Sequence, residues 1–282
     1  MEKALSGRGV LAGWAVPIVA IVILSGCAQS MTGPERAAAK RSAEVDAINR
    51  DPVGYLRRLY QRCDALEQYR LKFYRQERLG LIPSLGEMEE IDAAFRKEPF
   101  SVKFEWADPK MPYFESVYAA GQNDNKLLVR ERRGILLAPP QLRAVDVDLP
   151  VKLGMAKNPI TAFGLANIAY RTLAPFEDEK LKKVMTVNCE GIVDLEPTGQ
   201  RAYHLVIERP PTKGYRYTRQ DFYVDVSTGW PAGTDLWLKD GQLDARYRYA
   251  AVNTDVELTD QDFKTKPPAS QPGKTRTKPP GG

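Results

Sequence analysis

The chain has 282 residues, with 41 lysines and arginines against 36 aspartates and glutamates, one histidine and three cysteines. Its ordinary aromatic, glycine and cysteine content excludes collagen-like, disulfide-scaffold and wholly disordered classes, and leaves a globular protein. The formal charge of +5 lies in residues 264–282, which carry basic residues and no acidic ones, while the rest of the chain is close to neutral. That tail has no aromatic residue on which a base could stack, so we expect no nucleic-acid binding.

The N-terminus has the order of an export signal. Lys3 and Arg8 precede an apolar stretch from Val10 to Leu24, and the tetrapeptide Leu24-Ser25-Gly26-Cys27 follows. At about 1.5 Å per residue this stretch would span about 22 Å as a helix, which is less than the ~30 Å hydrocarbon core of a bilayer. A cleaved signal over residues 1–26 is therefore favoured over a transmembrane helix.

The tetrapeptide that ends at Cys27 resembles the bacterial lipobox. The resemblance implies that the Cys27 thiol receives a diacylglycerol, that the signal is removed before it, and that the new amino group is acylated. Several acyl chains, at about 0.8 kcal/mol per buried CH₂, give stable membrane anchoring. Ala28 stands where an aspartate would resemble an inner-membrane retention signal, so we expect the outer membrane, with the protein facing the periplasm. The alternative is an ordinary signal with a chance cysteine.

Residues 27–50 are expected to form a tether, polar and alanine-rich, that is flexible or partly helical. Asp51-Pro52 predicts the start of a helix, because aspartate caps an N-terminus and proline is tolerated at the first helical position. The helix is predicted to run to about Glu67, with an apolar stripe formed by Val53, Leu56, Leu59, Tyr60, Cys63 and Leu66.

From Tyr69 onward the apolar residues recur with a period of two, which is typical of half-buried strands. The strands are predicted at 69–74, 89–95, 102–106, 113–119, 126–132, 184–193, 202–209, 216–226, 234–239 and 243–250, with a last short one near Val256. Residues 134–158 contain three prolines and are predicted to form a loop that lies across another part of the protein. Asn158-Pro159 repeats the cap-then-proline pattern and predicts a second helix up to about Thr172.

These elements predict an α+β fold, namely a single, strongly curved antiparallel sheet of about ten or eleven strands. A sheet of that size must curl, and one helix before it and one helix in mid-chain can cover its apolar face. The sheet domain is expected over residues 51–263. Residues 264–282 are expected to be a disordered basic tail, either solvated or in contact with anionic headgroups or peptidoglycan.

Few residues indicate catalysis. The sequence has no Gly-x-Ser-x-Gly motif and no phosphate-binding glycine loop, and one histidine leaves no His/Cys cluster for zinc. His204 alternates with the apolar residues of its strand and is expected at the surface. Carboxylates such as Glu105, Glu190 and Asp194 have no diagnostic spacing. We therefore expect a protein that is not an enzyme, with no catalytic residue, metal or cofactor; a carboxylate-pair hydrolase is the remote alternative.

Two cysteines remain besides Cys27. Cys63 and Cys189 would sit in an oxidising compartment, where disulfides persist. Cys63 lies on the helical apolar stripe and Cys189 in a predicted strand, which favours buried free thiols over a bridge. The sequence leaves both interpretations open.

Several segments, in order, resemble the LolA/LolB superfamily of periplasmic lipoprotein carriers and receptors, and above all an uncharacterised bacterial envelope family within it. The segment Phe222-Tyr223-Val224-Asp225-Val226-Ser227-Thr228-Gly229-Trp230-Pro231 is similar to the "strand, Asp, x, x, x, Gly, x, Pro" segment of the superfamily. Further likenesses are Tyr69 to Glu77, Pro99 to Trp106, Asn158 to Leu165 and Leu236 to Phe263. The resemblance implies an incomplete β-barrel over about residues 51–263. The same fold carries lipoproteins, acts as a receptor or senses envelope stress, so it does not decide the function.

An apolar concave face of such a half-barrel would suit an acyl chain, because hiding apolar groups from water needs no directed partner. The candidate lining residues are Leu71, Phe73, Phe104, Trp106, Leu205, Ile207, Phe222, Val224 and Tyr247. The alternative for each is ordinary core packing under the helices. We expect a monomeric, membrane-anchored lipoprotein that binds a lipid or a lipoprotein acyl chain. The second hypothesis is a sensor or scaffold that binds a partner protein through the same fold.

Overall fold

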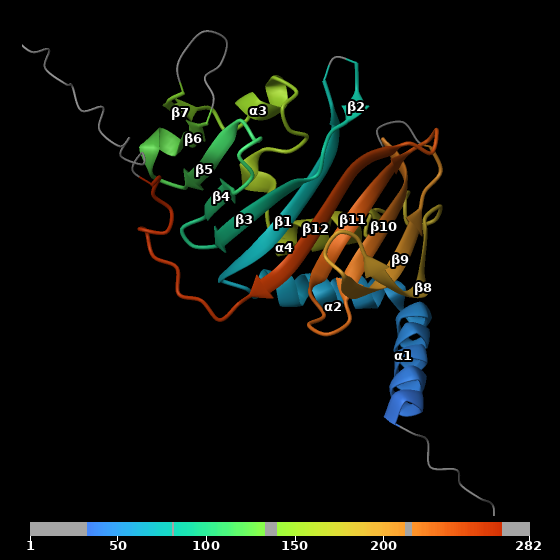
Figure 1. Cartoon of the computed structure of the whole chain (residues 1–282). Coiled ribbons are helices and arrows are strands. Elements are labelled where there is room, and N and C mark those ends of the chain that lie inside the picture. Colours follow the sequence, from blue (N-terminus) through green and yellow to red (C-terminus); the bar gives the residue numbers. More distant parts are fainter. Residues whose placement is uncertain (1–32, 81, 133–139, 212–215, 267–282) are drawn as a thin grey trace, which may run out of the picture. The chain divides into compact units, whose positions relative to one another are not determined.

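The computed structural model describes residues 33–266, apart from residues 81, 133–139 and 212–215. The predicted signal, Cys27 and most of the predicted tail lie outside these residues. The described residues from Lys40 onward form one compact unit. Figure 1 shows the arrangement of its strands and helices.

One antiparallel sheet of twelve strands organises this unit, which confirms the predicted fold class. The strands are β1 (Gln68–Leu79), β2 (Ser84–Leu85), β3 (Glu89–Arg96), β4 (Ser101–Trp106), β5 (Tyr113–Ala119), β6 (Leu127–Glu131), β7 (Leu142–Val145), β8 (Thr186–Leu195), β9 (Gln200–Glu208), β10 (Tyr217–Asp225), β11 (Pro231–Leu238) and β12 (Leu243–Asn253). Their spatial order is β7-β6-β5-β4-β3-β1-β12-β11-β10-β9-β8, with β2 paired only to β1.

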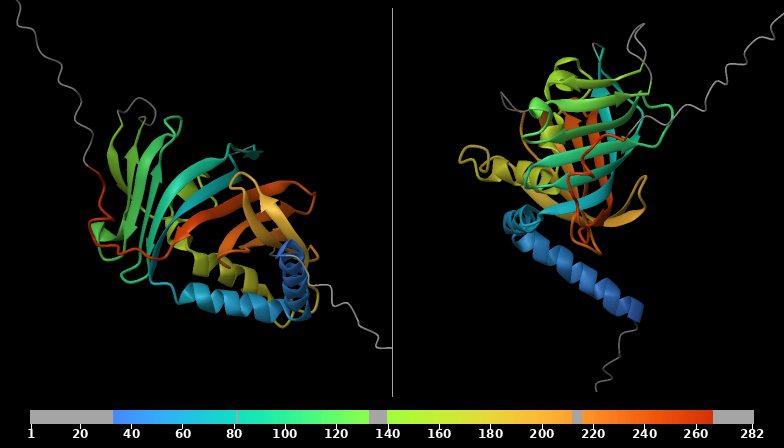
Figure 2. Two further views of the ribbon diagram at one scale, coloured as in Figure 1. Left: turned by 60° about the horizontal axis from the view of Figure 1, so that its bottom comes forward. Right: turned by 90° about the vertical axis from the view of Figure 1, so that its left-hand side faces the viewer.

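The sheet consists of two meanders joined in its middle. The first meander runs outward from β1 to β7, the second runs inward from β8 to β12, and β1 pairs with β12 with Phe73 opposite Tyr249. The chain crosses from one edge, β7, to the other edge, β8, through residues 146–185. The strands therefore curl without closing into a barrel (Figures 1 and 2).

Four α-helices accompany the sheet: α1 (Gly33–Arg50), α2 (Pro52–Asp64), α3 (Leu149–Lys152) and α4 (Leu165–Leu173). α2 begins as predicted, because a carboxylate oxygen of Asp51 accepts a hydrogen bond from the Gly54 N–H at 2.9 Å. α2 and α4 pack against each other, and both lie on the concave side of the sheet (Figure 2). Within residues 27–50, where a tether is predicted, the structure has a helix from Gly33 onward.

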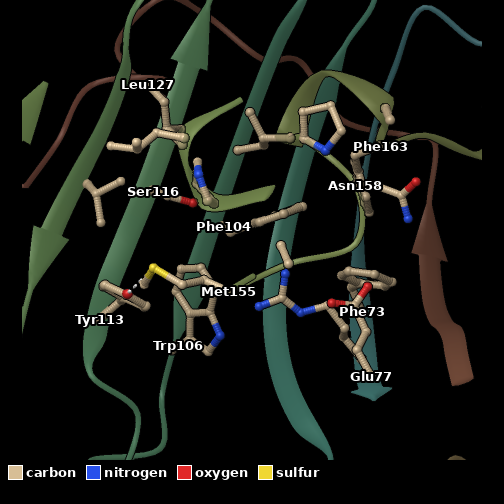
Figure 3. A pocket seen from close by; sticks show the side chains of 18 of the residues that line it. Phe73, Glu77, Phe104, Trp106, Tyr113, Ser116, Leu127, Met155, Asn158 and Phe163 are labelled. Atoms are coloured by element: carbon tan, nitrogen blue, oxygen red, sulfur yellow. Dashed lines mark hydrogen bonds between the residues drawn. The ribbon is translucent and has the colours of Figure 1, made fainter. Parts of the chain in front are cut away.

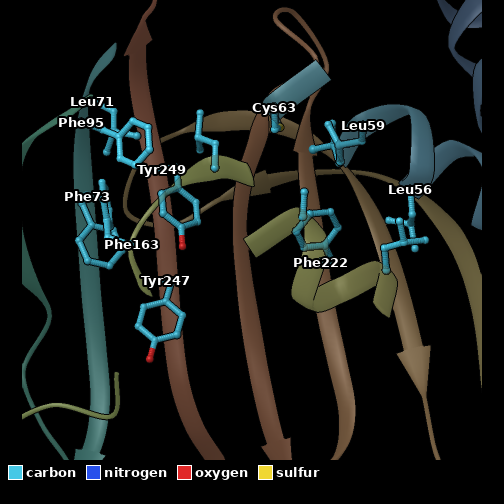
Figure 4. Packing of buried hydrophobic residues seen from close by; sticks show 14 of the residues in the cluster. Leu56, Leu59, Cys63, Leu71, Phe73, Phe95, Phe163, Phe222, Tyr247 and Tyr249 are labelled. Carbon is cyan, nitrogen blue, oxygen red and sulfur yellow. The ribbon is translucent and has the colours of Figure 1, made fainter. Parts of the chain in front are cut away.

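The main core lies between the concave face and these helices. Leu56, Leu59 and Cys63 of α2 point toward the same layer as Phe222 of β10 (Figure 4). Both cysteines are buried free thiols, Cys63 on α2 and Cys189 on β8, so the structure contains no bridge between them. A smaller cluster lies on the convex face, where Leu258 and Phe263 pack with Ala94, Val117 and Ala119.

The mid-chain helix starts later than predicted. Ile160–Ala162 form a single 3₁₀ turn (η2), and α4 begins only at Leu165. Gly164 has φ +140, and a Cβ there would lie 3.2 Å from the Phe95 ring. The Leu165 N–H then donates to the buried Tyr69 hydroxyl at 2.8 Å. A tertiary contact with β1 therefore sets the start of the helix at Leu165. The local capping pattern had predicted a start at Asn158-Pro159.

Two further predictions were wrong in detail. The predicted loop 134–158 contains strand β7 and helix α3 within its described part. The predicted strand near Val256 is absent, because β12 is already paired with β1 and β11 and leaves no free sheet edge beside it. Residues 254–266 instead carry Leu258 and Phe263 onto the convex face.

Candidate apolar binding pocket

A pocket of about 190 Å³ opens on the concave side of the half of the sheet that contains β1 and β4–β7. Its other wall is the segment 149–163, which we call the strap, together with the first turns of α4. Figure 3 shows Phe73, Phe104 and Trp106 on the strands, facing Met155 and Phe163 of the strap. The pocket is thus a gap between a curved sheet and the chain that crosses it.

The two halves of the concave face differ because the helices cover only one of them. α2 contacts β8 and α4 contacts β11, so these helices lie over the second meander. Leu205, Ile207, Phe222 and Val224 are fully buried there. The first meander is covered by the strap, which consists of α3, the η2 turn and irregular chain, and the pocket remains between the strap and the strands.

Four of the nine predicted lining residues line the pocket: Phe73, Phe104, Trp106 and Tyr247. The other five, Leu71, Leu205, Ile207, Phe222 and Val224, belong to the packed core and are not among the lining residues. The alternation of side chains along a strand assigned all nine residues to the correct face of the sheet. It could not separate core residues from pocket residues, because an inward-facing residue has the same period whether helices or empty space lie above it.

Sequence reasoning missed the lining residues of β5, β6 and the strap. They include Tyr113, Leu127, Val129, Leu149, Pro150, Leu153, Met155, Ile160 and Phe163. The available signal was the proline-rich stretch 134–158, which was predicted to lie across another part of the protein. The apolar residues of that stretch have no regular period, so no pattern in the sequence identifies them as lining residues.

A buried polar network joins the strap to the centre of the sheet. The Tyr247 hydroxyl donates to Glu77, and the Lys157 N–H donates to the same carboxylate at 3.2 Å. The Lys157 ammonium pairs with Asp244 at 2.9 Å, and the side chains of Lys157 and Asp244 are 11% and 0% exposed. Burial and the neighbouring Glu77 charge raise the pKa of Tyr247, so its hydroxyl remains a donor. These contacts anchor the strap where it passes over β1 and β12.

Two ion pairs hold the lining arginines Arg75 and Arg143. Arg75 Nη2 lies 2.8 Å from Glu89 Oε2, and the same carboxylate oxygen accepts a hydrogen bond from Trp106 Nε1 at 2.8 Å. Arg143 of the edge strand β7 pairs with the buried Glu131 of β6 at 2.5 Å. Most charged side chains around the pocket are therefore matched within the protein.

His204 lies on the convex face, as expected, but only 14% of its side chain is exposed. Its Nε2 lies 3.0 Å from Asp221 Oδ1, and its ring stacks on Tyr223 at 5.0 Å. Burial alone would raise the pKa of Asp221, but hydrogen bonds from His204, Arg219 and Trp237 outweigh it and hold that pKa below its usual value. The Asp221 carboxylate thus belongs to a network of hydrogen bonds on the convex face, away from the pocket.

Within the described residues, no group of three or more His, Cys, Asp or Glu side chains could hold a metal ion. The helices in this part of the chain are all too short or too polar to cross a membrane.

Comparison with protein families matches residues 66–271 to the model of a family described as protein of unknown function, DUF1571. The match covers well over half of the 282 residues, so the chain belongs to this family. The prediction of an uncharacterised family is thereby confirmed, and the incomplete barrel implied by the LolA/LolB resemblance is the fold observed. No curated protein matches the chain.

Solved structures with similar folds include MucB, at 15% identity and a TM-score of 0.46 over 76% of this chain and 62% of MucB. The Mycobacterium tuberculosis lipoprotein LppX is similar at 10% identity and a TM-score of 0.37, over 74% of this chain and 100% of LppX. LprF from Mycobacterium bovis is similar at 10% identity and a TM-score of 0.38, over 73% of this chain and 95% of LprF. The chain spans less than two thirds of the length of MucB.

Proposed function

We propose that this protein is an envelope lipoprotein that binds an acyl chain of a lipid or lipoprotein in the pocket beneath the strap, without catalysing a reaction. The observation that carries the proposal is the pocket, whose two walls are formed mainly by aromatic and aliphatic side chains. An acyl chain placed there would gain about 25 cal/mol per Å² of apolar surface removed from water.

The size of the pocket limits what it accepts with the strap in place. Its volume of about 190 Å³ is below the ~300–1,000 Å³ typical of ligand pockets. The closed pocket therefore suits part of one acyl chain, and a longer chain requires the strap to move outward. Leu153 and Met155 of the strap are 62% and 40% exposed, whereas Ile160 and Phe163 belong to the main core, so the part of the strap before Ala156 is the part that could move outward.

A pair of matched substitutions tests the pocket. Val129 lines the pocket and is half-buried, whereas Val184 is 49% exposed and is not a lining residue. Val129→Trp should fill the pocket and abolish binding of a fluorescent fatty acid, while Val184→Trp should bind like the wild type. Met155→Trp, at a partly exposed lining position of the strap, offers a second filling variant if Val129→Trp unfolds.

Native mass spectrometry of the protein extracted from its own membrane supplies the direct readout. We expect a lipid-sized adduct on the wild type and on Val184→Trp. A wild-type protein that carries no adduct and ignores fluorescent fatty acids would overturn the proposal, and so would full binding by both filling variants.

The proposal includes anchoring through Cys27, which the lipobox resemblance supports. Replacing this residue in Cys27→Ala should abolish metabolic labelling with a fatty acid and release the protein from the membrane fraction or leave it with its signal attached. Density-gradient separation of the two membranes should find the wild type in the outer membrane. Unchanged lipid labelling of Cys27→Ala would contradict the anchor.

A further inference from the structure

The charged side chains around the pocket are not all neutralised. Three arginines and two glutamates line it: Arg75, Arg143, Arg171, Glu77 and Glu131. Arg75 and Arg143 each pair with a carboxylate, and Glu77 is held by a hydroxyl and a backbone N–H. Arg171 forms no ion pair with any residue that the structure describes, so one positive charge at the pocket is available to a ligand.

Arg171 stands at the boundary between the pocket and solvent. It lies in the last turn of α4, one turn beyond the lining residues Asn167 and Ile168, and it is exposed. Its Nη1 donates to Asn158 Oδ1 of the strap at 2.8 Å, and the Asn158 amide in turn donates to the Tyr247 hydroxyl at 3.4 Å. These contacts orient the guanidinium over the pocket opening.

The charge of Arg171 also acts on the pocket interior. Tyr249 lines the pocket, and burial raises its pKa while the positive charge of Arg171 opposes that rise. A guanidinium has five N–H donors in a planar fork that matches carboxylate and phosphate oxygens, and the hydrogen bond to Asn158 leaves most of them without a partner among the described residues.

We propose that Arg171 binds the anionic headgroup, a carboxylate or a phosphate, of an amphiphile whose acyl chain occupies the pocket. This inference rests on the proposed function and specifies its ligand class. The apolar walls hold the chain, and the guanidinium at the opening selects an anionic head over a neutral one of the same chain length. Asn158 is a positioning residue that keeps the guanidinium over the opening.

Three probes with the same chain test the inference: oleic acid, oleoyl lysophosphatidic acid and oleyl alcohol, each below its critical micelle concentration. The wild type should bind at least one of the acidic probes about tenfold more tightly than the alcohol. In Arg171→Gln this preference should disappear while the affinity for the alcohol stays unchanged. Arg171→Lys should keep part of the preference, because the charge remains and the fork is lost.

The matched control is Arg58→Gln, which removes an exposed arginine of α2 that pairs with Asp51 outside the pocket. It should bind all three probes like the wild type. Equal wild-type affinity for the acids and the alcohol would overturn the anionic-head inference and leave the acyl-binding proposal standing, as would an unchanged preference in Arg171→Gln. Failure of all three probes to bind the wild type would overturn both.

Discussion

At the scale of single residues, a buried ion pair on the convex face joins Arg248 to Asp235. Arg248 donates from Nη1 and Nη2 to the two carboxylate oxygens of Asp235 at 2.7 and 3.1 Å. The two residues are 3% and 2% exposed, and Arg246 binds the same carboxylate from the side at 3.1 and 3.2 Å. The bidentate geometry offsets the cost of removing both charges from water.

Removing one partner should therefore be costly. Arg248→Met leaves the buried Asp235 with the half-buried Arg246 as its remaining ion-pair partner among the described residues and with the Tyr223 hydroxyl as a long hydrogen-bond donor. We expect the free energy of unfolding to fall by about 3 kcal/mol. Urea denaturation followed by circular dichroism measures this change. Arg58→Met, which breaks the exposed pair with Asp51, is the control and should cost less than about 1 kcal/mol. Equal effects of the two substitutions would contradict the stabilising role of the buried pair.

At the scale of secondary-structure elements, the end of α1 is joined to an edge of the sheet. Asn49 Oδ1 accepts a hydrogen bond from the Cys189 N–H at 2.7 Å, and Asn49 Nδ2 donates to the Cys189 carbonyl at 2.9 Å. The Asn49 side-chain amide thus pairs with the backbone of the edge strand β8 in the way that a residue of a neighbouring strand would. Ile48 beside it is buried in the core. An exposed edge would otherwise present unpaired backbone groups to other chains.

Asn49→Ala should expose this edge locally. We expect the free energy of unfolding to fall by about 1 kcal/mol, because two hydrogen bonds at a partly exposed site are replaced by hydrogen bonds to water. The sharper readout is hydrogen exchange, in which the Cys189 amide should exchange faster. Arg50→Ala, at the exposed neighbouring position, should leave that amide unchanged. Unchanged exchange of the Cys189 amide in Asn49→Ala would show that the amide does not protect the edge.

At the scale of the whole described unit, two covers lie on opposite faces of one sheet. Helices and the strap cover the concave face, and residues 254–266 cross the convex face of the first meander. Arg96 pairs with Asp260 at 2.8 Å and lies 4.8 Å from the ring centroid of Phe263, while the Lys103 ammonium donates to the Lys264 carbonyl at 3.0 Å. The C-terminal segment thereby shields small apolar side chains such as Ala94 and Val117.

Phe263 should contribute most of this shielding, since it is 1% exposed. Phe263→Ala is expected to lower the free energy of unfolding by about 3 kcal/mol, the cost of removing a buried phenyl ring and leaving a cavity. The matched control is Phe114→Ala, because Phe114 is 45% exposed and contacts solvent. Thermal unfolding should separate the two variants clearly, and equal midpoints would show that the C-terminal segment does not stabilise the sheet.

Some parts of the fold are specified by short stretches of sequence. The Asp225 carboxylate accepts hydrogen bonds from the Ser227 and Thr228 N–H groups at 2.9 and 2.7 Å, and Gly229 follows with φ +70. These residue types form the turn from their own side chains, so the segment was recognisable in the sequence. The start of α2 at Asp51-Pro52 was predictable for the same reason.

The sequence by itself determined the antiparallel meanders, the opening helix and the face on which each apolar strand residue lies, because turn chemistry and a period of two are local properties. Only the tertiary structure decided which stretch of the inward face is hollow. That depends on whether packed helices or the strap lies opposite, and residues such as Leu205 and Phe104 have the same pattern in either case. Tertiary structure also decided the late start of α4 and the position of Arg171 at the pocket opening, because each depends on contacts between residues far apart in the chain.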